Sequence, residues 1–173
     1  MSSMTQIRIE KVTLNIGAGK SVEKLEKGIK LIKMITGIDP VKTITKKRIP
    51  SWGLRPGLPV GCKLTLRKEK ARQVLANLLK AKENILTEDN FDERGNMSFG
   101  LHEYIDIPGV KYSPEIGIMG LQVCVTFEKP GFRVKRKKTG SRKISSKHEM
   151  KREEAMAYLI KNFNIKMKEE SEK

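Results

Sequence analysis

Residues 39–68, DPVKTITKKRIPSWGLRPGLPVGCKLTLRK, decide the fold that this chain is predicted to adopt. Residues 41–48 and 60–67 are rich in β-branched and apolar side chains, which predicts two strands. Residues 49–59 between them contain three prolines and two glycines, which predicts a projecting loop without regular structure. No acidic residue stands between Asp39 and Glu69, so we expect this unit to be strongly basic.

The second of these strands alternates with a period of two residues, which is typical of a strand buried on one side only. Its apolar members are Val60, Cys62, Leu64 and Leu66. Its polar and small members are Gly61, Lys63, Thr65 and Arg67. The polar side is either an ordinary solvated surface or a surface for phosphate and ribose oxygens, to which Lys, Arg and Thr donate well. The first strand would broaden this polar side with Lys42, Thr43, Thr45, Lys46 and Lys47, which favours the second interpretation.

The composition indicates a polyanionic partner. The 173 residues include 36 Lys or Arg and 20 Asp or Glu, a formal net charge of +16. Excess charge of this size is self-repulsive in isolation and is neutralised by nucleic acid. A membrane partner is disfavoured because no segment combines a long apolar stripe with a basic face, and no transmembrane span is expected.

The remaining pattern predicts one α+β domain over residues 1–173. Residues 7–16 are expected to form either one strand with a bulge near Glu10 or two short strands, because the parity of the apolar residues changes there. Helices are expected at 21–36, 69–86 and 149–162, and a further half-buried strand at 121–128. In the first helix the buried stripe would include Val22, and in the last helix Ile160. A short edge strand is expected near Phe163 and Ile165, followed by a frayed tail at 168–173.

We therefore expect a mostly antiparallel sheet with helices packed on one face and an open, polar and basic opposite face that binds RNA. The basic loop at 129–147 has no acidic residue, and its Pro130, Gly131 and Gly140 disfavour a continuous helix. It is either a solvated, disordered loop or a segment that becomes ordered against phosphate.

Motifs for catalysis and metal binding are weak. The GAGKS sequence at 17–21 follows a strand and opens a helix, as a phosphate-binding loop does, but Leu14 stands where the motif needs its first glycine. The alternatives are a structural turn or a turn whose amides meet RNA phosphate. His102, His148, Cys62 and Cys124 lack metal-ligand spacing, so we expect no metal, no cofactor and no catalytic residue. Both thiols are expected to be free and buried or half-buried in a reducing cytoplasm.

Two further features have open interpretations. Trp52, the only tryptophan, lies in the Pro/Gly-rich loop and is either a plug over the core or a side chain presented for stacking on a base or ribose. Residues 88–115 are enriched in acidic side chains, which is typical either of a solvated face or of a contact with a basic protein.

Four stretches carry a resemblance to a known family: RIEKVTLNIGAG (8–19), ITGIDPVKTITKKRIPSWGLRPGLPVGCKLTLR (35–67), FDERGNMSFGLHEY (91–104) and IMGLQVCVTF (118–127). With the helices between them, they cover nearly the whole chain, which resembles the large-subunit ribosomal protein five family that binds 5S ribosomal RNA. The sequence GFRVKRKKTG followed by KHEMKREEAMAY is similar to the archaeal and eukaryotic branch of that family.

The resemblance implies a structural constituent of the large ribosomal subunit in the cytoplasm and not an enzyme. The partners that it implies are 5S and large-subunit ribosomal RNA in the central protuberance, peptidyl-site transfer RNA, and neighbouring ribosomal proteins that include one of the small-subunit head. A free-standing RNA chaperone or regulator is the alternative.

Carried onto this sequence, the resemblance implies three sets of contact residues. The 5S-facing set is Asn15, Thr43, Thr45, Lys46, Lys63, Thr65 and Arg67. The set that faces transfer RNA is Ser51, Trp52, Gly53, Leu54, Arg55, Pro56 and Gly57, within the loop at 49–59. Further ribosomal RNA contacts are expected from Arg133, Lys135, Arg136, Lys137, Lys138, Arg142 and Lys143.

Overall fold

The fold is organised around β1 (Arg8–Gly17), the central strand of a five-stranded sheet. The computed structural model describes residues 3–168. The strand order is β2-β3-β1-β6-β5, and every neighbouring pair is antiparallel. The other strands are β2 (Val41–Ile44), β3 (Pro59–Leu66), β5 (Met97–Leu101) and β6 (Leu121–Glu128). The predicted class, α+β with a mostly antiparallel sheet, is confirmed.

Alternation along β1 separates the two faces of the sheet. Val12 and Leu14 are fully buried, whereas Thr13 and Asn15 between and after them point to the other face and are half-buried. The pairing with β6 shifts register between Ile9 and Lys11, so the bulge predicted near Glu10 is present. Because a bulge places two residues of one strand opposite one residue of its partner, it resets the alternation at this end of β1.

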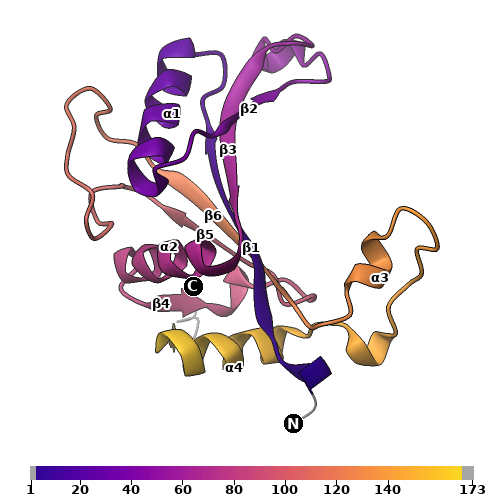
Figure 1. The fold of residues 1–173 in the computed structure, drawn as a ribbon. Helices are drawn as coiled ribbons and strands as arrows, with labels where there is room; N and C mark the ends of the chain where they lie inside the picture. Colours follow the sequence, from indigo (N-terminus) through magenta and orange to yellow (C-terminus); the bar gives the residue numbers. More distant parts are fainter. Residues whose placement is uncertain (1–2, 169–173) are drawn as a thin grey trace.

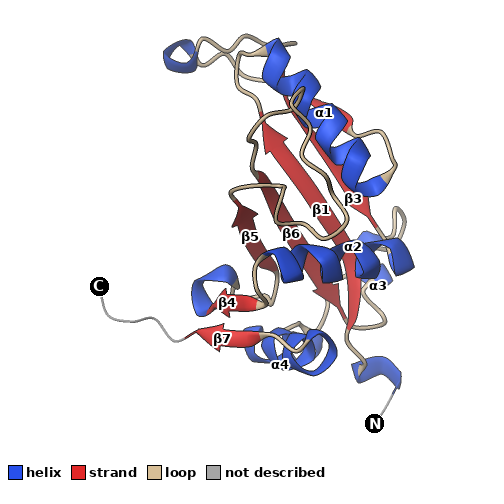
Figure 2. Ribbon diagram, turned by 90° about the vertical axis from the view of Figure 1, so that its left-hand side faces the viewer, coloured by secondary structure: helices blue, strands red, loops and turns tan. Residues whose placement is uncertain are grey.

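Two helices cover the apolar face, as Figure 2 shows: α1 (Val22–Thr36) and α2 (Lys68–Ala81). The hydroxyl of Ser21 caps α1 by accepting from Lys24 N at 3.3 Å. Gly37 ends the helix with a φ of 71°, in the left-handed region that glycine adopts readily. Val22 is exposed rather than buried, because it is the first residue of α1 and the stripe that packs on the sheet begins at Leu25.

The second helix is shorter than predicted. It ends at Ala81 rather than at 86, because Glu83 and Asn84 adopt positive φ values of 57° and 56°, which a helix cannot contain. Leu86 is buried, but in strand β4 (Ile85–Thr87), which pairs in parallel with β7 (Lys166–Lys168). Strand β7 is the edge strand that was predicted near Phe163 and Ile165. It begins at Lys166, three residues after Phe163, and ends at Lys168. The rest of the predicted tail lies outside the described residues.

The remaining helices lie at the end of the sheet where β1 begins (Figure 1). In α4 (Arg152–Phe163), Ala155 and Leu159 are buried, whereas Ile160, one residue further around the helix, is exposed. Residues 129–147 contain α3 (Arg133–Arg136), which lies on the opposite side of the sheet from α1 and α2 (Figure 1). Short 3-10 helices complete the chain: η1 (Ser3–Thr5), η2 (Pro50–Trp52), η3 (Glu88–Asn90) and η4 (Ser146–His148).

An ion pair between a buried lysine and a half-buried glutamate anchors the start of the basic segment at 129–147. Lys129 is only 6% exposed, and its Nζ lies 2.6 Å from Glu154 Oε2 in α4. At the other end, His148 Nε2 lies 2.8 Å from Pro130 O, and the rings of His148 and Phe132 are in contact. The segment is therefore fixed at both ends by contacts within the protein, in addition to any contact with a partner.

The first testable prediction concerns this ion pair. Burial raises the pKa of Glu154, but the hydrogen bond from Lys129 and the interactions with Lys151 outweigh it, so the pKa lies below its ordinary 4.5. A pKa lowered on folding contributes stability above the unfolded pKa that is lost as the pH falls through the folded pKa. We expect Glu154→Gln to lower the free energy of unfolding at neutral pH by about 1–3 kcal/mol, because it leaves a buried ammonium without its counter-charge.

Denaturant titrations of both proteins at neutral pH and below the folded pKa of Glu154 measure this difference. The difference should shrink in acid, where the wild-type carboxyl group is protonated as well. Glu153→Gln is the matched control: Glu153 is the exposed neighbour of Glu154, and its replacement should change stability by no more than about 0.5 kcal/mol. Equal losses in the two variants, or a loss independent of pH, would exclude a special role for the pair.

Candidate nucleic-acid interface

The face of the sheet that α1 and α2 leave uncovered is polar. Cross-strand pairs in β1 and β3 place Asn15 beside Lys63 and Thr13 beside Thr65. Strand β6 adds Gln122 opposite Asn15 and Cys124 opposite Thr13, and β5 adds Ser98 opposite Cys124. We call this surface the open face and define it by Thr13, Asn15, Lys63, Thr65, Ser98, Gln122 and Cys124. All of them are exposed or half-buried, and none is acidic.

A close approach at Gly61 and an internal hydrogen bond order the open face. Gly17 lies opposite Gly61, and a Cβ at Gly61 would stand 2.5 Å from the carbonyl oxygen of Ile16, so no larger residue fits there. Asn15 Nδ2 donates to Gln122 Oε1 at 3.1 Å. This bond orients both amides and leaves Asn15 Oδ1 and Gln122 Nε2 without a hydrogen-bond partner among residues 3–168. Donors and acceptors that are already ordered lose less entropy when they bind a ligand of complementary shape.

The structure brings part of the predicted 5S-facing set together. Asn15, Lys63 and Thr65 belong to the open face, and Thr43, which pairs with Gly61, extends it. The hydroxyl of Thr45 instead closes the base of the projecting loop, because it lies 2.7 Å from Arg55 O and 2.8 Å from Leu58 O. Arg67 follows β3 at the end of the open face and donates to Glu10 Oε1 at 2.9 Å.

Lys46 lies beyond the strand that was predicted to hold it. Strand β2 ends at Ile44 and not at residue 48. Its register shifts between Thr43 and Ile44, where the partner residue is Pro59, which has no N–H to donate. Lys46 is exposed in the connection that follows, and Lys42 has the parity of the apolar face. The basic character of the open face therefore depends on fewer lysines than the sequence suggested.

Four members of the open face were absent from the predicted set: Thr13, Ser98, Gln122 and Cys124. Their alternation within β1, β5 and β6 was the available signal, but the order of the strands decides that they adjoin Lys63 and Thr65. Cys124 is exposed, which corrects the expectation that both thiols are buried or half-buried. Its position on the open face explains the exposure, whereas Cys62 has the opposite parity and is buried beneath α1.

The projecting loop at 49–59 is closed by reciprocal backbone bonds between Ile49 and Leu54, each 3.0 Å long. Leu54 is buried, which corrects its place among residues that face transfer RNA. The other predicted loop residues are exposed: Ser51, Trp52, Gly53, Arg55, Pro56 and Gly57. Trp52 is 66% exposed and is therefore not a plug over the core. The loop presents one large aromatic ring and one guanidinium to solvent.

The GAGKS turn is engaged within the protein. Ala18 N and Gly19 N both donate to Val60 O, at 2.8 and 3.1 Å. A Cβ at Gly53 would clash with the Nζ of Lys20, so the side chain of Lys20 rests against the projecting loop. These contacts favour the structural interpretation of the turn, because its amides and its lysine support β3 and the loop.

Charge is divided between the two sides of the sheet. The basic segment at 129–147 stands on the side of the open face, and the acidic loops after β5 lie beside α1 on the helical side (Figure 1). Glu115 pairs with Lys30 of α1 at 2.7 Å; this contact raises the pKa of Lys30 and lowers that of Glu115. An RNA on the open face would therefore meet the cations of 129–147 and not this acidic region.

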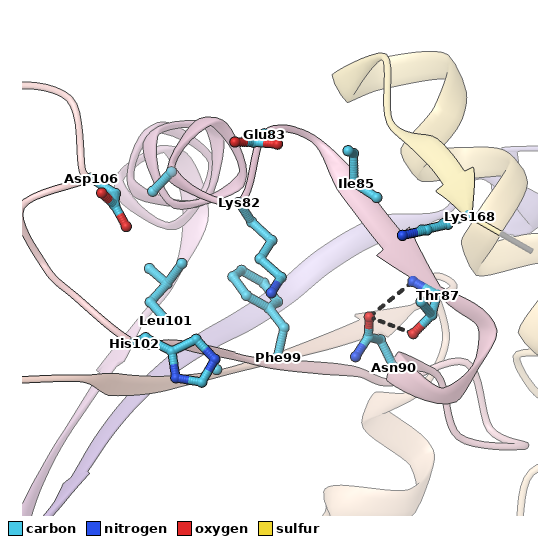
Figure 3. A pocket seen from close by; sticks show the side chains of 12 residues that line it. Lys82, Glu83, Ile85, Thr87, Asn90, Phe99, Leu101, His102, Asp106 and Lys168 are labelled. Atoms are coloured by element: carbon cyan, nitrogen blue, oxygen red, sulfur yellow. Dashed lines mark hydrogen bonds between the residues drawn. The ribbon is translucent and has the colours of Figure 1, made fainter. Parts of the chain in front are cut away.

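A pocket of about 450 Å³ lies between the end of α2, β4 and β5, as Figure 3 shows. Its lining mixes apolar and charged side chains, among them Phe99, His102 and Asp106. Asn90 Oδ1 accepts from Thr87 N at 3.0 Å and from Thr87 Oγ1 at 3.2 Å (Figure 3), so these two residues cap the short helix η3. Their polar groups serve the local fold.

The described residues contain neither a metal site nor a membrane span. Within residues 3–168, no three His, Cys, Asp or Glu side chains are grouped to hold a metal ion. In the same range, no helix has both the length and the hydropathy to cross a bilayer. The fold and the open face define a basic α+β protein whose principal surface suits nucleic acid.

Comparison with known proteins identifies the family. A model of the C-terminal part of the ribosomal protein L5 family matches residues 59–167, and a second model, of ribosomal protein L5, matches residues 2–55. The chain belongs to the ribosomal protein L5 family, whose members are structural and not enzymatic. The family resemblance predicted from the sequence is thereby confirmed.

Similar proteins from three archaea agree with the expected branch. Each is named large ribosomal subunit protein uL5. The protein of Nanoarchaeum equitans is 47% identical over 95% of this chain and 97% of its own length. That of Methanobrevibacter smithii is 43% identical over 95% of this chain and 97% of its own length. That of Sulfurisphaera tokodaii is 44% identical over 95% of this chain and 94% of its own length.

The second prediction concerns the two thiols. Burial raises the pKa of Cys62 and shields it, whereas Cys124 is exposed on the open face. We expect a short pulse of maleimide to label Cys124 alone in the folded protein and both thiols after denaturation. Peptide mass spectrometry measures the two extents, and Cys124→Ser, as the control, should remove the fast label. Rapid labelling of Cys62 would contradict the placement of the two faces.

Proposed function

We propose that this protein binds 5S ribosomal RNA through its open face and helps to form the central protuberance of the large ribosomal subunit. Its family and its relatives make it a structural component of the large subunit, whose partners are the ribosome and ribosomal RNA. It acts in the cytoplasm as part of the ribosome. The 5S RNA contact is the specific assignment that the open face supports.

The observation that carries the proposal is the open face itself, whose members include hydroxyls, amides and a lysine but no acidic residue. A double-stranded RNA helix offers a wide, shallow minor groove with 2′-hydroxyls, and proteins recognise it mainly by shape and by sugar and phosphate contacts. The hydroxyls of Thr13, Thr65 and Ser98 and the amides of Asn15 and Gln122 can exchange hydrogen bonds with 2′-hydroxyls. Lys63 lies among them and can neutralise a phosphate.

The projecting loop and the acidic loops support two further contacts. Trp52 is exposed at the tip of the projecting loop, where an aromatic ring can stack on a nucleotide, and Arg55 can pair with a phosphate. We assign this loop to peptidyl-site transfer RNA. The acidic residues of 88–115 are exposed, and the loop after β5 lies beside α1 on the helical side. We assign this acidic region to a basic protein of the small-subunit head.

The third prediction tests the open face by titration of labelled 5S RNA in the presence of excess transfer RNA. The wild-type complex should survive the competitor. Lys63→Ala should weaken it about tenfold, because one charge-assisted contact to phosphate is lost. The same change should reduce the slope of log K against log salt by about one. Footprinting gives a second readout: bound RNA should protect Cys124 from maleimide.

Lys42→Ala is the matched control, because Lys42 is an exposed lysine on the neighbouring strand with the opposite parity. It should change the affinity by no more than about twofold, the effect of a remote charge screened by salt. Complete loss of wild-type binding to the competitor would favour the free-standing RNA chaperone instead. Equal losses of affinity in the Lys63 and Lys42 variants would show that the RNA does not bind to the open face.

The fourth prediction separates the loop from the open face. The double variant Trp52→Ala, Arg55→Ala keeps Leu54 and the backbone bonds that close the loop. We expect its 5S RNA affinity to stay within about twofold of wild type, because both side chains lie outside the open face. Large subunits that contain it should translate more slowly in a reconstituted system. A comparable loss of 5S RNA binding would contradict this division of roles.

A further inference from the structure

Three arginines converge on two buried carboxylates at one end of the open face. Arg8 Nη2 lies 2.6 Å from Glu128 Oε1, and Arg136 Nη2 lies 2.5 Å from Glu128 Oε2. Arg136 Nη1 and Arg67 Nη1 each lie 2.9 Å from Glu10 Oε1. We call these five residues the arginine cluster. Arg136 bridges the two carboxylates, so the cluster is one connected network.

Distant parts of the chain supply the cluster. Arg8 begins β1, Glu10 lies at its bulge, and Glu128 ends β6. Arg67 follows β3, and Arg136 ends α3 in the basic segment. Glu128 has the parity of the open face, and it is buried because two arginines cover it. The cluster therefore continues the open face and joins it to residues 129–147.

The glutamates are buried while the guanidiniums remain accessible. The side chains of Glu10 and Glu128 are 8% and 7% exposed, whereas those of Arg8, Arg67 and Arg136 are 60%, 54% and 47% exposed. Three cations against two carboxylates leave an excess positive charge on the outer side. The bonds to glutamate occupy only part of each guanidinium, and Arg8 Nη1 and Arg67 Nη2 have no partner among residues 3–168.

All five residues of the arginine cluster line a pocket of about 640 Å³, to which Lys68, Glu69, Arg72 and Tyr158 also contribute. Guanidinium is a planar fork that matches phosphate oxygens in pairs, and its recognition is strongest when the side chain is already ordered. Here the carboxylates have fixed the arginine rotamers before any ligand arrives, so binding loses less side-chain entropy.

We propose that the arginine cluster is a pre-organised receptor for a backbone phosphate of the RNA that lies on the open face, and that Glu10 and Glu128 are its positioning residues. This inference rests on the proposed function. It also unites two predicted contact sets, because Arg67 of the 5S-facing set and Arg136 of the further ribosomal RNA contacts share Glu10. A single RNA would therefore contact the open face and residues 129–147 continuously.

A positioning role for the two glutamates and a simple effect of net charge predict opposite changes in RNA affinity. Glu10→Gln and Glu128→Gln each remove an acidic group from an RNA-binding surface, so charge alone predicts tighter binding. If the carboxylates position the arginines, each substitution should weaken 5S RNA binding about fivefold to tenfold. It should also lower the slope of log K against log salt by about one, because an ordered phosphate contact is lost. Fluorescence titrations over a salt range measure both quantities.

Glu69→Gln is the matched control for charge: Glu69 lines the same pocket and has no salt bridge within residues 3–168. It should leave the affinity unchanged or slightly raised. Arg136→Lys keeps the charge but cannot bridge both carboxylates, and it should weaken binding about fivefold. Arg48→Lys is its matched control and should have little effect, because Arg48 is an exposed arginine outside the arginine cluster and outside the three predicted contact sets. If a glutamate variant melts at a lower temperature than the assay allows, the two arginine variants decide the question.

These measurements test 5S RNA binding and the role of the arginine cluster separately. Failure of the wild-type protein to bind 5S RNA selectively would overturn the proposed function and the arginine cluster with it. Selective wild-type binding, together with glutamate and Arg136→Lys variants that bind as tightly or more tightly, would overturn the cluster alone. Weaker binding by Arg136→Lys but not by Arg48→Lys, at unchanged net charge, is the result that supports a positioned phosphate site.

Discussion

The pairing of β1 on both of its edges is the constraint on which the rest of the structure depends. Hydrogen bonds to β3 and β6 fix the register, so Val12 and Leu14 face the helices while Thr13 and Asn15 face outward. A slip of one residue would exchange these faces and bury polar groups without partners. The same alternation along β1 therefore forms the core on one face of the sheet and the proposed RNA-binding surface on the other.

The local sequence pattern predicted the bounds of those elements that are determined by neighbouring residues. Strand β3 and helix α1 each lie within one residue of their predicted bounds. It was insufficient at Leu86, whose spacing fits the buried stripe of α2 as well as a buried strand. The choice is made by β7, a partner some eighty residues further along the chain, which no local window contains.

Some residues of the candidate site were likewise predictable from local pattern, and others were not. Alternation identified Asn15, Lys63 and Thr65, but Ser98 and Cys124 join them only through the order of the strands. Nothing in the basic run at 129–147 distinguishes Arg136 from its neighbours. Its bonds to Glu10 and Glu128 arise from a meeting of α3 with β1 and β6, and acidic partners embedded in alternating strands leave no separate signal in the sequence.

The position of β1 also constrains how the protein is made. Synthesis delivers β1 first and β3 soon afterwards, but Arg8 and its partner Glu128 are 120 residues apart. One edge of the central strand therefore stays unpaired until most of the chain has left the ribosome, and unpaired edges invite association between nascent chains. The 36 lysines and arginines oppose such encounters through mutual repulsion. The positive charge that favours RNA binding by the folded protein thus also opposes association between incompletely synthesised chains.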